Sequence, residues 1–194
     1  MKLPEPDIEG KMPFEAAAQN RRSRRLFIDK AVSLKQLGQL LWSAQGRSDS
    51  RGFKTVASAG ATFPLEVYAV TGEVDGLELG LYRYLGETHS LELVQEGDLR
   101  NKLAAAALSQ QFIARAPATV VIAAAYARTS GRYGRRAERY VHMEVGHAGQ
   151  NVYLQCEALG LGTCAVGAFD DGAVKELLGI KEEPLYLLPV GYAR

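Results

Sequence analysis

The sequence has few cysteines, no long apolar run and no excess of charge of either sign. Only Cys156 and Cys164 occur among 194 residues, which is too few for a disulfide scaffold. No apolar run reaches the about 18 residues that a membrane span needs, and the formal net charge is +1. These absences argue against a disulfide-stabilised secreted domain, a membrane protein and a strongly basic nucleic-acid-binding protein. We therefore expect a cytoplasmic protein.

Several motifs with known chemistry are also missing. The chain contains no Gly-x-Gly-x-x-Gly at the start of a helix, no Gly-x-x-x-x-Gly-Lys-Ser/Thr and no Gly-x-Ser-x-Gly. A Rossmann site, a P-loop and a serine-hydrolase elbow are therefore unsupported. Glu144 and His147 have the Glu-x-x-His spacing of di-iron bundles, but such sites need two of these pairs and two further carboxylates. His89 and His142 are in no such pair, so we expect no metal.

The chain length predicts one domain, over residues 13–194, after a loose Pro-rich lead-in over residues 1–12. Ser33 and Asp170 are predicted helix N-caps, and His89 is expected in an exposed hairpin turn. Helices are expected from 13 into the arginines after 20, and over 33–46, 99–108, 110–115, 132–159 and 170–178. Strands are expected over 65–70, 80–84, 91–94, 119–125, 163–166 and 185–190. Dispersed strands without a strict βαβ repeat indicate an α+β fold or a mixed sheet with helices on both faces.

The most unusual stretch in the sequence surrounds Ser23 with Arg21, Arg22, Arg24 and Arg25. Four guanidinium groups so close together repel one another and need water, carboxylates or an anion to balance them. Arginine pairs well with phosphate through charge-assisted hydrogen bonds. A solvated basic face, a nucleic-acid contact and a site for a phosphorylated cofactor are all consistent with this cluster.

Two further stretches are rich in small side chains. Residues 57–61, Ala-Ser-Ala-Gly-Ala, precede the predicted strand at 65. Such a run either lets a flat ligand or another backbone approach closely or simply forms a tight turn. Residues 167–170, Gly-Ala-Phe-Asp, connect a predicted strand to a helix. A turn of this kind can offer free backbone N–H groups to a ligand.

Taken in order, these stretches resemble the flavin-dependent nitroreductase family, and most closely its SagB-type branch of thiazoline/oxazoline dehydrogenase-like proteins. The resemblance extends from about Phe14 to the end of the chain. The stretches that carry it are Arg21–Phe27, Leu41–Gly46, Ser58–Tyr68, Glu144–Leu154, Gly160–Phe169 and Pro184–Gly191. It implies an α+β fold with a mixed or antiparallel central sheet flanked by helices. It also implies a homodimer with bound FMN at the interface, so residues 13–194 would be one FMN-binding domain.

The resemblance implies roles for particular residues as well. Arg21, Ser23 and Arg25 match the positions that hold the FMN phosphate and the polar edge of the ring, and Arg22 lies next to them through its backbone. Arg194 is a candidate for a last phosphate contact. Ser58, Ala59 and Ala61 match the segment that reaches the flavin from the partner subunit. Val166, Gly167 and Ala168 match the turn whose backbone N–H faces flavin N5.

The implied activity is hydride transfer from NAD(P)H through flavin N5 to a small electron-poor acceptor, such as a nitro compound or a quinone, in a ping-pong cycle. The cofactor carries this chemistry, so no side-chain acid or base is nominated. Tyr126, Arg128 and Tyr133 are candidates for lining the acceptor pocket. Two alternatives stay open: oxidation of peptide azolines, as in the SagB-type branch, and FMN binding without turnover. A nucleic-acid partner is not expected.

Overall fold

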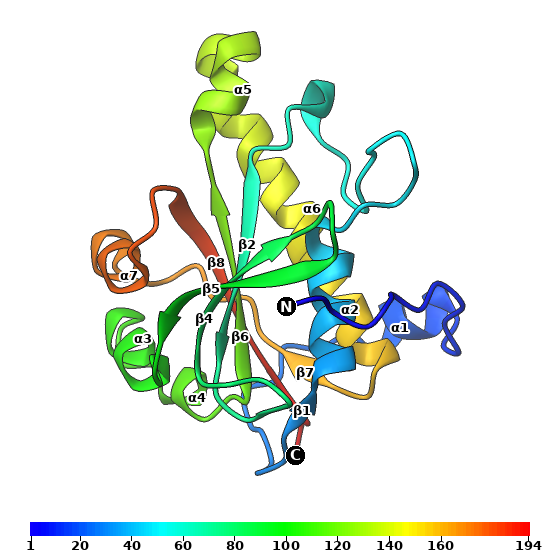
Figure 1. Cartoon of the computed structure of the whole chain (residues 1–194), viewed down its shortest axis with the longest axis vertical. Helices are drawn as coiled ribbons and strands as arrows, with labels where there is room; N and C mark the ends of the chain where they lie inside the picture. The colour runs from blue at the N-terminus through cyan, green and yellow to red at the C-terminus, as the bar shows by residue number, and fades with distance from the viewer.

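The computed structural model describes residues 1–194 and is built around one antiparallel sheet. Its six strands have the order β5-β4-β2-β6-β8-β7 (Figure 1). In that order the strands are Ser90–Glu96, Gly80–Leu85, Leu65–Thr71, Ala118–Ala124, Glu183–Gly191 and Gly162–Thr163. A separate pair, β1 (Val32–Ser33) and β3 (Val74–Asp75), is parallel. The α+β fold predicted from the sequence is confirmed, and within the large sheet every pairing is antiparallel.

Helices cover both faces of the sheet. Figure 1 shows α1, α2 and α6 on one side and α3, α4 and α7 on the other. The helices are α1 Phe14–Asn20, α2 Leu34–Gln45, α3 Arg100–Ala106, α4 Gln111–Ala114, α5 Tyr126–Tyr133, α6 Ala137–Ala158 and α7 Asp171–Leu178. Two short 3₁₀ turns, η1 (Ala59–Ala61) and η2 (Gly134–Arg136), complete the fold. No helix has the length and apolar character that crossing a membrane requires.

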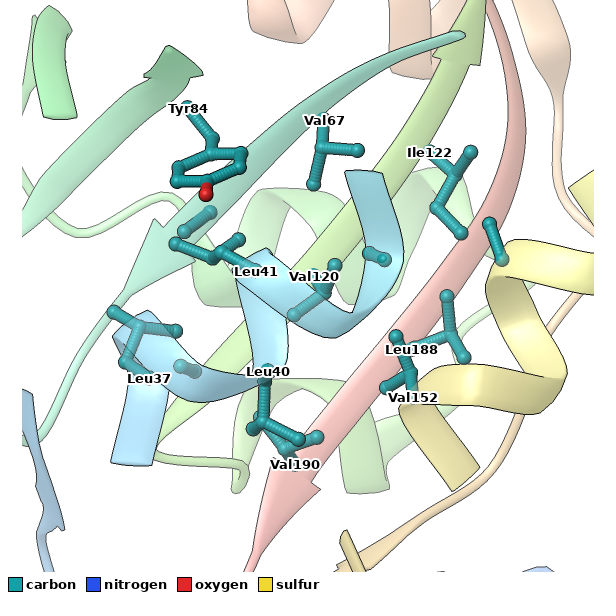
Figure 2. Close-up of a cluster of buried hydrophobic side chains, with 14 of the residues drawn as sticks. Leu37, Leu40, Leu41, Val67, Tyr84, Val120, Ile122, Val152, Leu188 and Val190 are labelled. Atoms are coloured by element: carbon teal, nitrogen blue, oxygen red, sulfur yellow. The ribbon is translucent and has the colours of Figure 1, made fainter. Parts of the chain in front are cut away.

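Strand β6 shows why the sheet separates two cores. All seven of its residues are buried, as the continuous apolar run predicts for a strand covered on both faces. Because successive side chains point to opposite faces, Val120 and Ile122 enter the core beneath α2 and α6, whereas Val121 enters the core beneath α3, α4 and α7. Figure 2 shows the first core, where Leu37, Leu40 and Leu41 of α2 meet β6 and β8.

The predicted helix caps are present. Ser33 forms a capping box with Gln36, because its hydroxyl accepts from the Gln36 N–H at 3.2 Å and the Gln36 side chain accepts from the Ser33 N–H at 3.0 Å. Asp170 accepts from the Ala173 N–H at 2.8 Å at the start of α7. Each cap satisfies a backbone donor that the first helical turn leaves free. Both helix starts therefore follow from the local sequence.

The long helix begins later than predicted. The chain forms α5, breaks at Gly134 and starts α6 at Ala137, whereas the sequence predicted one helix from Arg132. Gly134 has φ 52°, in the left-handed region that glycine adopts most easily. The strand expected over 163–166 is also shorter: β7 ends at Thr163, and only Val166 bridges to Leu187 of β8 afterwards.

The first residues of the chain pack onto the fold and do not lie loose. Met1 and Leu3 hydrogen-bond through their backbones to Leu91 and His89, and the Leu3 side chain is only 3% exposed. The expectation that His89 is exposed is wrong, because this segment covers it. Its ring bonds to the Tyr84 hydroxyl at 2.8 Å and to the Pro4 carbonyl at 2.9 Å, so both ring nitrogens have partners.

Candidate functional site

The stretch Arg21–Phe27, here called the arginine segment, lies along β7 and the end of the chain. Ser23 bridges to Thr163 of β7, and the Arg24 N–H donates to the Thr163 carbonyl at 2.8 Å. Further along, the Arg194 N–H donates to the Leu26 carbonyl at 3.0 Å. The structure thus brings the predicted residue Arg194 next to the arginine segment by backbone pairing.

The four guanidinium groups of the arginine segment form no salt bridge with any carboxylate of the chain. The Arg21 guanidinium lies over the Tyr153 ring at 5.1 Å, and that of Arg25 lies over the Phe112 ring at 5.9 Å. Arg22 folds back and donates to the carbonyls of Gln19 and Arg21 at 2.9 and 2.8 Å. Clustered cations without a counter-charge attract an anion, so this surface is suited to a phosphate.

Tyr153 of α6 connects the arginine segment to a second predicted site. Its hydroxyl is 2.9 Å from the Ser23 hydroxyl and accepts from the Ala165 N–H at 2.8 Å. Ala165 directly precedes the turn of Val166, Gly167 and Ala168. No local pattern in the sequence points to this role, because the bonded partners lie 130 and 12 residues away along the chain.

The turn after Ala165 presents backbone donors at the surface. Val166 is buried and pairs in both directions with Leu187 of β8, which fixes the start of the turn. Gly167 and Ala168 are exposed, and neither N–H group donates to an acceptor within the chain. Two unpaired N–H groups beside the arginine segment can bind acceptor atoms of a ligand.

Ser58, Ala59 and Ala61 are not brought to the same place. They belong to a loop, Ser58–Phe63, here called the Ser58 loop, which lies near the opposite end of the molecule from β7 and the C-terminus (Figure 1). The loop starts beside Ala57, whose carbonyl is 3.3 Å from His147 Nδ1. Tyr153 is six positions after His147 in α6, which places it about 9 Å further along the helix and about 120° away around its axis. The two parts therefore contact different faces of this helix within one chain.

Helix α5 holds the Ser58 loop in an unusual conformation. Ala61 and Phe63 have φ values of 53° and 43°, which are uncommon for residues with a side chain. Arg132 donates to the Gly60 carbonyl at 3.1 Å, and the hydroxyls of Thr62 and Thr129 are 2.9 Å apart. Strained backbone of this kind persists where its surroundings fix it, and it often occurs at functional sites.

Two of the predicted pocket residues also contact this region, whereas the third lies beside α6. Arg128 donates to the Phe63 carbonyl at 3.0 Å and pairs with Glu66, and the Tyr133 hydroxyl lies against Gly60. The Tyr126 hydroxyl bonds instead to His142 of α6 at 2.8 Å. Arg128 and Tyr133 thus serve first to support the Ser58 loop.

The comparisons with known proteins agree with the fold. The model of the Nitroreductase family matches residues 18–192. A Methanocaldococcus jannaschii protein named "Putative nitroreductase MJ1384" is 50% identical over 98% of this chain and 96% of its own length. A Ralstonia eutropha crystal structure, described as that of a putative nitroreductase, superposes with a TM-score of 0.86 at 31% identity, covering 100% of this chain and 89% of that one.

Two more distant proteins are also similar to this chain. The trifolitoxin operon protein TfxC of Rhizobium leguminosarum is 26% identical over 89% of this chain, which spans 53% of that protein. The NADPH:FMN oxidoreductase of Vibrio harveyi, solved with NAD⁺, shares the fold with a TM-score of 0.66 at 18% identity, over 93% of this chain and 68% of that one. The family match covers most of the chain and agrees with the sheet and helices described above. The protein belongs to the nitroreductase family and is an oxidoreductase.

Proposed function

We propose that the protein binds FMN and passes hydride from NAD(P)H to a small electron-poor acceptor, such as a nitro compound or a quinone, in a ping-pong cycle. Bound FMN would supply the hydride chemistry at its N5 atom. The observation that carries this proposal is the connection through Tyr153, which links unpaired guanidinium groups to a turn with unpaired backbone donors.

The donors of the site fit the chemical groups of FMN. Arg21, Ser23 and Arg25 would hold the phosphate, since no carboxylate of the chain competes for these cations. Arg194 would lie at the edge of the same anion site. The free N–H groups of Gly167 and Ala168 would face flavin N5, and the lack of large side chains at these two positions lets a flat ligand approach the backbone.

We further propose that two copies of the chain complete the site. The Ser58 loop contacts a different face of α6 from Tyr153, so its residues would meet the flavin of a partner subunit. The face of α6 that remains open carries Met143, which is 52% exposed, and Gly146, where an added methyl group would meet no atom within 4 Å. Phe14 of α1 is 68% exposed. Exposed apolar side chains on these two helices favour burial against a second copy.

Reconstitution with FMN tests this proposal. We expect the purified protein to bind FMN, to become yellow, and to lose that colour when NADH or NADPH is added without oxygen. The double variant Arg21→Ala, Ser23→Ala should bind FMN at least roughly 100-fold more weakly, because a hydrogen bond to a charged group contributes about 1.5–3 kcal/mol. Arg51→Ala is the matched control, since Arg51 pairs with Asp49 outside the site.

The outcomes separate the candidate functions. A protein that binds FMN but is not bleached by either nicotinamide would be an FMN-binding protein without turnover. Turnover with nitro compounds or quinones supports the proposal, and turnover only with peptide azolines would support the SagB-type alternative. A colourless protein, or equal FMN affinity in the double variant and the wild type, would show that the assignment of the arginine segment is wrong.

A further inference from the structure

Helix α6 carries a stripe of three polar side chains that faces the segment leading into the Ser58 loop. Asn151 donates to the Thr55 carbonyl at 3.2 Å and to the Ser43 carbonyl at 3.0 Å. His147 Nδ1 lies 3.3 Å from the Ala57 carbonyl, which makes this nitrogen the donor. Glu144 is one turn further along the same face. The stripe therefore runs antiparallel to residues 55–58 and ends at Glu144.

Glu144 differs from the other two members of the stripe because its carboxyl group is not fully paired. Its side chain is buried, with 2% of the residue exposed, and Oε1 has no hydrogen-bond partner. It forms no salt bridge with any cation of the chain. A buried carboxylate without a partner is costly, so such groups hold a proton up to higher pH.

The surroundings of Glu144 set its protonation. Burial raises the pKa of Glu144 from 4.5 to about 7, against the opposing effects of the Ser58 hydroxyl, His147 and Lys54. Lys54, from the loop after α2, is itself half-buried, and burial lowers its pKa. Near neutral pH the carboxyl group therefore exists in both its protonated and its ionised form. That is the condition under which a group exchanges protons most effectively.

Ser58 connects this buried carboxyl group to the surface. The Ser58 hydroxyl oxygen accepts from the Phe63 N–H at 2.9 Å, which leaves its own O–H free to donate. The same residue directly precedes η1, where Gly60 and Ala61 are exposed. The Ser58 loop is held in place by α5, as described above. The effect of the Ser58 hydroxyl on the pKa of Glu144 indicates that the two groups are neighbours, and the loop that Ser58 starts reaches the surface that we assign to a bound ligand.

We propose that Glu144 is the proton-holding residue of the site and passes its proton to the bound acceptor through the Ser58 hydroxyl. The inference rests on the proposed function and adds to it. Glu144 would act through Ser58 and not touch the acceptor itself, so it is a positioning and proton-supplying residue. It would serve the site to which the Ser58 loop of its own chain contributes.

The proposed step balances in protons and electrons. Reduction of the acceptor by two electrons takes up one hydride, which originates from NAD(P)H, and one proton. The Ser58 O–H bond breaks as its proton moves to the acceptor, and the serine oxygen takes the proton from the Glu144 carboxyl group. The carboxylate that remains regains a proton from water before the next turnover. No oxidant or reductant is needed beyond those of the proposed function.

The first test measures the proton on Glu144 directly. An infrared titration of the protein should show a carboxyl C=O band that disappears with a midpoint near pH 7 and is absent in Glu144→Gln. This readout does not depend on turnover or on FMN. A Glu144 band that is lost already below pH 5 would overturn the proposal, because the residue would then hold no proton at neutral pH.

The second test uses the pH dependence of the two half-reactions in the FMN-loaded protein. Acceptor reduction by the wild type should slow as pH rises above about 7, whereas Glu144→Gln and Ser58→Ala should be slower by about 100-fold and independent of pH in this range. Ser58→Thr, which keeps the hydroxyl, should recover most of the rate. Asn151→Ala is the control for the stripe, because it loosens residue 55 and should keep the pH dependence of the wild type.

The outcomes distinguish this inference from the proposed function. If Glu144→Gln binds FMN and keeps the rate and pH profile of the wild type, the proton-holding role is wrong while the proposed function stands. If Asn151→Ala loses the pH dependence as fully as Glu144→Gln does, the effect belongs to loop position and the inference fails. If the wild type binds no FMN, both proposals fail together.

Discussion

The hydroxyl group of Tyr153 is the contact on which the arrangement of the site depends, and Tyr153→Phe removes only that atom. The Ala165 N–H, which is partly buried, loses its acceptor at 2.8 Å, and the Ser23 hydroxyl loses a partner at 2.9 Å. An unsatisfied buried donor costs about 1–3 kcal/mol, and a neutral hydrogen bond at an exposed site contributes about 0.5–1.5 kcal/mol. The phenyl ring stays beneath the Arg21 guanidinium. We therefore expect a loss of about 1.5–3 kcal/mol in the free energy of unfolding.

Thermal denaturation and FMN titration measure the two consequences. For a chain of this size the loss corresponds to a decrease in melting temperature of about 3–12 °C. FMN affinity should fall about 10-fold, because a tenfold change needs only about 1.4 kcal/mol. Tyr140→Phe is the matched control on the same helix, since the Tyr140 hydroxyl only accepts from Arg136 at the surface. If both variants melt at the same temperature and bind FMN equally well, Tyr153 does not connect the two parts of the site.

Three further substitutions test other parts of the structure. Gly162→Ala should lower stability by about 1–3 kcal/mol, because a methyl group there would lie 2.8 Å from the Arg24 side chain; an unchanged melting temperature would contradict this packing. Glu144→Gln should remove a pH dependence of stability. Because the pKa of Glu144 is raised in the folded protein, wild-type stability should fall as pH rises from 4.5 to about 7, by up to about 3 kcal/mol. Urea titrations across this range should show a flatter profile in the variant. Leu3→Ala should cost about 2 kcal/mol in the same assay, whereas Ile8→Ala, at a residue 81% exposed, should cost almost nothing.

Elements whose burial follows from their own sequence were predicted well. Strand β6 is a continuous apolar run, and the helix that Ser33 caps has leucines at helical spacing, so local pattern and tertiary packing agree. Helix α5 was missed because Tyr126–Tyr133 is rich in arginine, threonine, serine and glycine and contains few apolar residues. Long-range bonds from Arg128 and Arg132 to the Ser58 loop hold it in place. Such bonds leave no trace in a local pattern.

For the candidate site, too, the residue types could be predicted from local sequence, whereas the contacts between distant segments could not. Its composition was visible in the sequence as the arginine segment and the two runs of small residues. Their grouping was not, because Tyr153 contacts Ser23 across 130 residues and the chain end pairs with Leu26. In the sequence, Glu144 was noted as part of a rejected metal motif and of a stretch that carries the family resemblance, but not as a group that holds a proton. The missing partner of its Oε1 atom depends on tertiary packing, which no single stretch of sequence shows.

The position of α6 between two sites has a consequence for how the protein tolerates change. Through Tyr153 this helix holds the arginine segment, which we assign to the phosphate of its own site. Through His147 and Asn151 it holds the segment that leads into the Ser58 loop, which we assign to the site of the partner subunit. A shift of this one helix would then disturb both FMN sites of the dimer that we propose. A hybrid dimer that combines a chain defective at Arg21 with a chain defective at Ser58 would instead keep one complete site and concentrate both defects in the other.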